Sequence, residues 1–257
     1  MRRGVFLGVD VGSTTVKIVV LDSSETLLAW RYLRARGKPR QTLMAGMEDI
    51  AQEVGPEPLL SAGLTGSGGG PVATYLGVSH INELVAQVAA VGRYYPHTRT
   101  IIEIGGQDSK YMSVAWDEPS GKLVLADFAM NSLCAAGTGS FLDQQADRLG
   151  IFVEDDFGRL ALLSELPARI DGRCTVFAKS DMIHLQQRGT PLPDILAGLG
   201  MALARNFRSV IGRGKVFTSP VLFQGGVAYN KGVVRAFERV LNLDAGEIVV
   251  PEHPHLM

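Results

Sequence analysis

Cysteine is the scarcest chemically informative residue in this chain. Only Cys134 and Cys174 are present among 257 residues. Their wide separation excludes a CxxC redox motif or a zinc knuckle within one chain, so two unrelated thiols are the default interpretation. Long apolar runs are also missing, since none approaches the roughly 18 residues that span a bilayer. The apolar run at the N-terminus meets Asp10 too early for a signal peptide, and we expect a cytoplasmic protein without a membrane partner.

The chain also lacks an excess of either charge. Its 25 Lys and Arg residues nearly balance 26 Asp and Glu residues, for a formal net charge of -1. This balance argues against bulk electrostatic binding to nucleic acid or to an anionic membrane. A cationic run between residues 31 and 40 has only Trp30 and Tyr32 as neighbouring aromatics, which favours a solvated edge. The hydrophobic content of 46% is enough for two modest domains or one large one.

A polar glycine turn follows the first predicted strand. Residues 5–9 and 16–21 are rich in β-branched residues and flank the sequence DVGSTT, and a third strand is expected at 26–34. Asp10 could hold a magnesium ion through water, and Gly12 allows close backbone approach. The hydroxyl donors in the turn are Ser13, Thr14 and Thr15. Alone, the motif is explained equally well by a hairpin without a ligand.

The same layout then occurs a second time. Strands are expected at 100–104, 109–114 and 123–128, with the turn Gly105-Gly106-Gln107-Asp108 after the first of them. Two copies of a strand meander, each followed by helices, predict two similar α/β domains with a nucleotide between the glycine turns. We assign these domains to residues 1–96 and 97–257.

The stretch from Asn131 to Ser140 combines a cysteine with another glycine turn. Cys134 lies three residues before Gly137-Thr138-Gly139, which precedes a predicted helix at 140–149. Free N–H groups and the helix dipole would suit a phosphate, and the same field would stabilise a thiolate. The alternative is a glycine turn next to an ordinary buried cysteine. Cys174 likewise precedes a predicted helix, at 176–188.

The remaining segments complete the predicted α/β pattern. Helices are expected at 41–54, 83–94 (with Asn82 as N-cap), 153–166, 191–211 and 231–241, a loop at 66–71, and strands at 61–65, 220–223 and 248–250. After the strand at 220–223, Gly225-Gly226 would let the backbone approach an adenine ring or a ribose.

Taken together, five motifs resemble one family over nearly the whole chain. They are GVDVGSTTVK (8–17), EIGGQDSK (103–110), NSLCAAGTGSFLD (131–143), CTVFAKSD (174–181) and QGGVAYN (224–230). The sequence resembles the activators of 2-hydroxyacyl-CoA dehydratases and the related ATPase subunits of benzoyl-CoA reductases. These belong to the sugar kinase, actin and heat-shock chaperone superfamily. The resemblance implies two ribonuclease H-like domains with the nucleotide in the cleft between them.

The resemblance also implies an ATP site. Asp10 and Glu103 would form the magnesium shell, and Gln107 or Asp108 would position the attacking water. The residues implied to contact ATP are Gly12, Ser13, Thr14, Thr15, Lys17, Gly105, Gly106, Gly137, Thr138, Gly139, Gly225, Gly226 and Asn230.

The two cysteines match the family's cluster ligands. Family members are homodimers that share one 4Fe–4S cluster, with two cysteines from each chain. A 4Fe–4S cluster takes four thiolates, and a two-fold axis doubles the two present in this chain. A zinc ion shared across a dimer and two inert thiols remain the alternatives. The implied activity is ATP-driven transfer of an electron from the cluster to a 2-hydroxyacyl-CoA dehydratase or an acyl-CoA reductase-like partner. A reduced ferredoxin or flavodoxin would be the donor.

Three features depart from the family pattern. Glu103 stands where the superfamily usually has Asp, and Lys179 occupies a position that is often acidic in short activators. No closing C-terminal helix follows residue 250, which suggests a fragment of a longer activase. Two other functions stay open, a small-molecule (sugar) kinase of the same superfamily and a nucleotide-gated scaffold domain.

Overall fold

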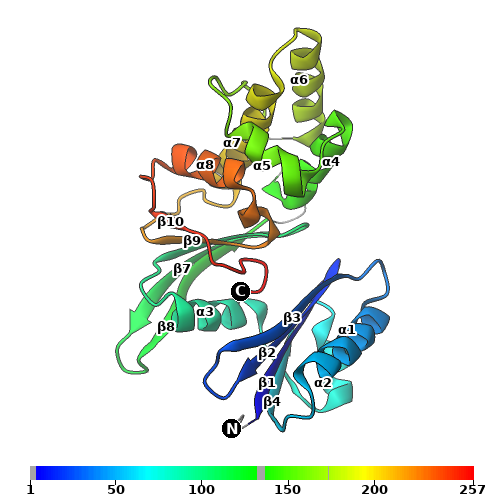
Figure 1. The fold of residues 1–257 in the computed structure, drawn as a ribbon. Helices are drawn as coiled ribbons and strands as arrows, with labels where there is room; N and C mark the ends of the chain where they lie inside the picture. The colour runs from blue at the N-terminus through cyan, green and yellow to red at the C-terminus, as the bar shows by residue number, and fades with distance from the viewer. Residues whose placement is uncertain (1–3, 132–136, 173) are drawn as a thin grey trace. The chain divides into compact units, whose positions relative to one another are not determined.

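Figure 1 shows the computed structural model, which describes residues 4–131, 137–172 and 174–257. The chain forms two compact units, of which the first reaches Ala89 and the second begins at Ala90. The division falls inside helix α3 (Glu83–Tyr94). The domain boundary expected after residue 96 remains a prediction, because compactness alone does not identify a ribonuclease H-like domain.

The first unit is built on a five-stranded sheet in the order β3-β2-β1-β4-β5. The first three strands form an antiparallel meander, whereas β4 pairs parallel to β1 and β5 pairs parallel to β4. Its strands are β1 (Val5–Val11), β2 (Thr15–Asp22), β3 (Leu27–Arg34), β4 (Leu59–Thr65) and β5 (Ser79–His80). Helices α1 (Pro39–Val54) and α2 (Gly69–Leu76) supply the crossovers that parallel pairing requires.

The core of this unit follows from the two periodicities of its elements. Val16, Ile18 and Val20 alternate along β2 and are buried on one face of the sheet. Leu43 and Ile50 lie two turns apart on α1 and belong to the same buried cluster. The apolar face of α1 therefore covers the apolar face of the sheet.

The second unit has a sheet in the order β10-β9-β6-β7-β8. Strands β6, β7 and β8 form an antiparallel meander, β9 pairs parallel to β6, and β10 pairs parallel to β9. Its strands are β6 (Thr100–Ile104), β7 (Ser109–Asp117), β8 (Lys122–Met130), β9 (Val221–Gln224) and β10 (Ile248–Val249).

Helical elements between β8 and β10 make up the rest of this unit. They are α4 (Gly139–Leu149), the π-helical turn η2 (Val153–Phe157), α5 (Gly158–Ala161), α6 (Thr175–Gln187), α7 (Leu192–Val210), the 3-10 turn η3 (Gly226–Tyr229) and α8 (Lys231–Leu241). The buried face of α7 includes Leu199, Leu203 and Phe207, which join Phe223 and Phe237 in one apolar cluster. This helix is core, as its periodicity predicts.

The two sheets have the same topology. In each, the third, second and first strands are neighbours, and the fourth and fifth strands continue the sheet beyond the first. The repeat predicted from the sequence is therefore confirmed at the level of strand order. No helix among the described residues is long and apolar enough to cross a membrane.

Two local predictions were wrong. The expected loop at 66–71 ends early, because α2 begins at Gly69 and runs to a left-handed Gly77 that caps it. The expected helix at 153–166 is broken, since the π-helical turn passes into α5, which ends at Ala161. Strand β5 was not anticipated. A helix that begins with glycines and a strand of two residues both give too weak a pattern to detect.

Candidate functional site

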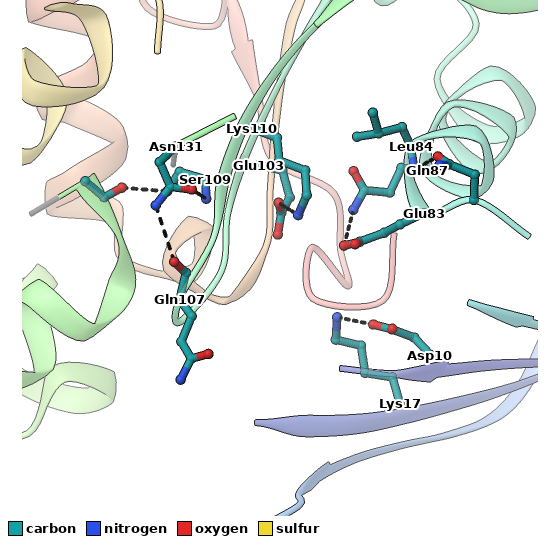
Figure 2. Close-up of polar contacts among 12 residues, drawn as sticks. Asp10, Lys17, Glu83, Leu84, Gln87, Glu103, Gln107, Ser109, Lys110 and Asn131 are labelled. Atoms are coloured by element: carbon teal, nitrogen blue, oxygen red, sulfur yellow. Dashed lines mark hydrogen bonds and ion pairs between the residues drawn. The ribbon is translucent and has the colours of Figure 1, made fainter. Parts of the chain in front are cut away.

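Three polar residues form a row across the first sheet, at the point where β1 reaches its glycine turn. Asp10 on β1 is in register with Lys17 on β2 and with Thr65 on β4. Lys17 Nζ donates to Asp10 Oδ2 at 2.7 Å, as Figure 2 shows. Residues in register on neighbouring strands project to the same face, so the three side chains share one face of the sheet. We call them the first row.

The backbone around the first row is tightly closed. Gly12 N donates to Thr15 O at 2.9 Å, and Thr14 O accepts from Ala35 N at 2.8 Å, so the turn that carries Ser13 is fixed at both ends. Gly66 follows Thr65 with a φ of 87°, and a Cβ there would lie 2.2 Å from Asp10 Oδ1. Only glycine fits at this position, because both the left-handed backbone and the space exclude a side chain.

The second sheet carries an equivalent row. Glu103 on β6 is in register with Lys110 on β7 and with Gln224 on β9. Lys110 Nζ donates to Glu103 Oε2 at 2.6 Å, and the Lys110 side chain is only 1% exposed. Figure 2 shows this ion pair and the one in the first row. We call these three residues the second row.

The turn after β6 repeats the closure of the first turn. Gly105 N donates to Asp108 O at 2.9 Å, the counterpart of the bond between Gly12 and Thr15. Gln107 lies in the same turn, where its carbonyl oxygen accepts from Asn131 Nδ2 at 3.4 Å. Gln107 and Asp108 therefore lie in the turn that follows the strand of Glu103. Asn131, the residue after β8, holds the backbone of this turn.

The turn at 137–139 packs directly against the turn after β6. Gly139 N donates to Gly105 O at 2.8 Å, and Ser140 N donates to Gly106 O at 2.9 Å. Ser109 Oγ also donates to Gly137 O at 2.5 Å. The expectation that this turn leaves its N–H groups free was therefore wrong for Gly139 and Ser140, which donate to carbonyl oxygens. Thr138, the buried N-cap residue of α4, lies between the contacts.

The third glycine motif of the unit meets the other two. Gly225 has a φ of 89°, and a Cβ there would lie 2.3 Å from Ile104 O. Gly226 begins the 3-10 turn, in which Val227 Cγ2 would lie 3.0 Å from a Cβ on Gly139. The segments containing the Gly105, Gly139 and Gly225 motifs therefore converge, and small residues permit the close approach of their backbones.

Asn230, a predicted ATP contact, has a structural role in the described chain. Its Oδ1 accepts from Val233 N at 3.1 Å and caps α8. Its Nδ2 is buried without a hydrogen-bond partner among the described residues. The side chain therefore retains a donor that the helix cap does not use.

Cys174 lies at the N-cap of α6, as predicted from its position before a helix. It is half-buried and is not in a disulfide. Cys134 lies outside the described residues. Among the residues that the structure describes, no group of three or more His, Cys, Asp or Glu side chains could hold a metal ion. Two cysteines per chain meet the four-thiolate requirement of a 4Fe–4S cluster only if a second chain contributes.

Asn206, which the sequence analysis missed, contacts the segment that leads to Cys174. Its Nδ2 donates to Gly172 O at 2.6 Å, and its Oδ1 would lie 2.9 Å from a Cβ on Gly137. It is 4% exposed, in the C-terminal part of α7. The signal was a lone asparagine on the apolar face of a long helix, since a buried amide needs partners.

Other members of the rows were also missed, namely Lys110, Thr65 and Gln224. The spacing held a signal for Lys110, because seven residues separate acid and lysine in both Asp10–Lys17 and Glu103–Lys110. A lysine seven residues after the acid, on the other side of a four-residue turn, falls opposite it in an antiparallel pair. Thr65 and Gln224 required knowledge of the strand pairing.

The rows supply suitable chemistry for magnesium. Hydrated Mg²⁺ takes one or two carboxylate oxygens and keeps several waters. Asp10 and Glu103 each direct one carboxylate oxygen to a lysine, and in the strand beside each acid a polar side chain has buried atoms with no hydrogen-bond partner in the described part of the chain. Each row, taken by itself, therefore has a carboxylate of the kind that hydrated magnesium takes.

Comparison with known proteins identifies the family of the chain. Residues 7–256 match the model of the BadF/BadG/BcrA/BcrD ATPase family. The chain is 34% identical to a 2-hydroxyisocaproyl-CoA dehydratase activator of Clostridioides difficile, covering 97% of this chain and 90% of the relative. It is 32% identical to the (R)-2-hydroxyglutaryl-CoA dehydratase activating ATPase of Acidaminococcus fermentans, covering 93% and 88%.

The fold comparison agrees. The solved structure of the Clostridium difficile activator with bound ADPNP matches with a TM-score of 0.85 at 33% identity, over 98% of this chain and 90% of that one. Solved structures below 25% identity include a ROK family glucokinase and support the fold alone. The fold is that of the two-domain actin and sugar kinase ATPases, as expected. The chain belongs to the BadF/BadG/BcrA/BcrD ATPase family.

Proposed function

We propose that this protein is an ATP-dependent activator that couples ATP hydrolysis to electron transfer from a shared 4Fe–4S cluster to a 2-hydroxyacyl-CoA dehydratase or an acyl-CoA reductase-like protein. The observation that carries the proposal is the packing around Asn206. This buried residue contacts both the segment leading to Cys174 and the glycine turn that packs on the turn after β6. A conformational change at the glycine turns would therefore displace the segment leading to Cys174 through the side chain of Asn206.

The ATP-binding part of the proposal rests on the glycine turns. Lys17 and the backbone of the turns at 12–15 and 105–106 would bind the phosphates, and Gly225-Gly226 would approach the adenosine. Asp10 and Glu103 would hold magnesium through water, which would supply positive charge at the phosphates. Gln107 or Asp108 would orient the attacking water, because both lie in the turn next to Glu103.

The cluster part of the proposal rests on Cys174. It lies half-buried at the N-cap of α6, and iron–sulfur clusters are held by cysteine thiolates. Cys174 and Cys134 of each chain would hold one cluster in a homodimer. When bound, the cluster would supply low-potential one-electron transfer. The names of the relatives support a dehydratase partner, and a reduced ferredoxin or flavodoxin is the proposed donor.

The test is an anaerobic purification followed by iron and sulfide analysis. We expect about two irons and two sulfides per chain in a dimer, since one 4Fe–4S cluster would be shared by two chains. Cys174→Ala is expected to lose the iron while still binding ADPNP. Ser164→Ala serves as a matched control, because Ser164 bonds Asp194 and lies outside the motifs. An iron-free monomer after anaerobic reconstitution would remove the electron-transfer function and leave an ATPase.

A further inference from the structure

Buried side-chain polar atoms at equivalent positions of the two sheets have no hydrogen-bond partner among the described residues. They are the Thr65 hydroxyl at the end of β4 and the side-chain amide of Gln224 at the end of β9. For Gln224, which is 0% exposed, neither the oxygen nor the nitrogen of the amide has a partner in the part of the chain that the structure describes. Buried amides are nearly always hydrogen-bonded, so this amide needs an explanation.

The positions of the two residues point to the explanation. Thr65 is in register with Asp10, and Gln224 is in register with Glu103. Each therefore lies on the same face of its sheet as an acid and a lysine, on the side of the acid away from the lysine. Each is followed by a glycine, Gly66 or Gly225, whose positive φ fixes the chain next to the residue after the acid.

Packing alone does not account for these residue types. Leucine has nearly the volume of glutamine and valine nearly that of threonine, and either would fill the site without an unpartnered polar atom. The free-energy cost of burying a polar atom without a partner therefore occurs twice, at the same place in two sheets of the same topology. A shared ligand-binding role explains both occurrences, because a ligand would supply the missing partners.

We propose that Gln224 and Thr65 are polar ligands of the magnesium–ATP site, with partners gained only when the nucleotide is bound. Glutamine Oε1 would accept from a water of the magnesium shell, and Nε2 would donate to a phosphate oxygen. The hydroxyl of Thr65 could accept from such a water or donate to a phosphate oxygen, because a hydroxyl group does both. The inference rests on the proposed ATP-binding function and adds two residues to it.

The test compares Gln224→Leu and Thr65→Val with the wild type, in two measurements. In the absence of nucleotide, both variants are expected to melt a few degrees higher, by about 2–4 °C, because a buried polar group without a partner is removed. In calorimetric titrations with ADPNP and Mg²⁺, both are expected to bind about tenfold more weakly, since one hydrogen-bonded ligand contact is lost.

Gln145→Leu is the matched control. Gln145 is also 0% exposed, and its Nε2 has no partner among the described residues, although its Oε1 accepts from Arg148 Nη1 at 3.0 Å; it lies on α4 and belongs to neither row. Its variant loses the hydrogen bond from Arg148, so its melting temperature is not expected to rise, but it should bind ADPNP with unchanged affinity. The control separates the general effect of replacing a buried glutamine by leucine from the loss of a nucleotide contact.

The outcomes separate this inference from the proposed function. A wild type that fails to bind ADPNP would remove both. A wild type that binds, with Gln224→Leu and Thr65→Val binding equally well, would overturn only the role of these side chains. Lower melting temperatures in both variants would also overturn it, because they would reveal partners in the free protein. If Gln224→Leu fails to fold, the smaller Thr65→Val change decides.

Discussion

The two rows have the same topology but differ in burial. In the first row, the side chains of Lys17 and Asp10 are 27% and 18% exposed, whereas in the second row those of Lys110 and Glu103 are 1% and 11% exposed. An exposed ion pair exchanges readily with water or a ligand, but a buried one is held by the cost of leaving either charge alone. The comparison indicates that one layout serves two purposes. The side chain of Lys17 is partly accessible to solvent, as its proposed phosphate contact requires, whereas Lys110 is a fixed counter-ion of Glu103.

The largest expected change in stability comes from removing the buried lysine, and removing the more exposed one is the comparison. Lys110→Met should lower the free energy of unfolding by about 3–5 kcal/mol, because it leaves the Glu103 carboxylate buried and unpaired. Lys17→Met, in the more exposed pair, should lower it by no more than about 1 kcal/mol. Denaturant titrations of both variants measure the difference.

A double variant sharpens the same comparison. Glu103→Gln combined with Lys110→Met removes both buried charges, so it should recover part of the stability that Lys110→Met loses. Equal losses for Lys110→Met and Lys17→Met would mean that burial does not distinguish the rows.

The glycines that follow the two rows are expected to have the next largest effect. Gly66→Ala and Gly225→Ala should each cost about 1–3 kcal/mol of stability, because alanine at a positive φ is strained. In addition, the new Cβ would lie within 2.5 Å of Val11 O in the first case and 2.3 Å of Ile104 O in the second. Thermal unfolding of the two variants measures the cost.

Gly70→Ala is the control for these two substitutions. Gly70 is near the start of α2, and nothing lies within 4 Å of its added Cβ. Alanine should leave the stability unchanged or raise it by up to about 1 kcal/mol, since it favours the helix. A loss as large as that of Gly66→Ala would show that any side chain in this region is destabilising.

The smallest expected effect concerns an exposed ion-pair network on the first sheet. The Arg31 guanidinium bonds Asp49 and Glu53 of α1, and this holds the pKa of Asp49 below its usual range. A lowered carboxyl pKa gives stability above the unfolded-state value near 4 that is lost as the pH falls through the folded-state value. Arg31→Gln should therefore lower the melting temperature slightly at pH 7 and not at all at pH 2.

Melting curves of wild type and Arg31→Gln between pH 2 and pH 7 test this prediction. The network is exposed, so its effect should also shrink in 1 M salt, unlike that of the buried Glu103–Lys110 pair. A difference that grows towards low pH would contradict the assignment.

The sequence predicted most of the elements because their patterns are local. The alternation in β2 and the seven-residue spacing of Leu43 and Ile50 on α1 are visible without knowledge of the fold. Asn82 as the cap of α3 was also predictable and is confirmed, since its Oδ1 accepts from Leu84 N at 2.9 Å. The broken helix after Val153 was not, because nothing in the pattern of that segment marks a π-helical turn.

The candidate site was predictable only in part. Glycines and acids that follow strands are recognisable in one dimension, so Asp10, Glu103 and the glycine turns could be named. Thr65, Gln224 and Asn206 could not, because their importance depends on the residue that lies beside each in space.

The sequence alone determined the two meanders, the glycine turns and the position of Cys174 before a helix, because each depends on neighbours along the chain. The tertiary structure alone decided that the N–H groups of Gly139 and Ser140 bind the turn after β6, since the partners lie about 34 residues away. It also decided that Lys110 is buried while Lys17 is partly exposed. Burial depends on what packs over a strand, which the strand's own residues do not specify.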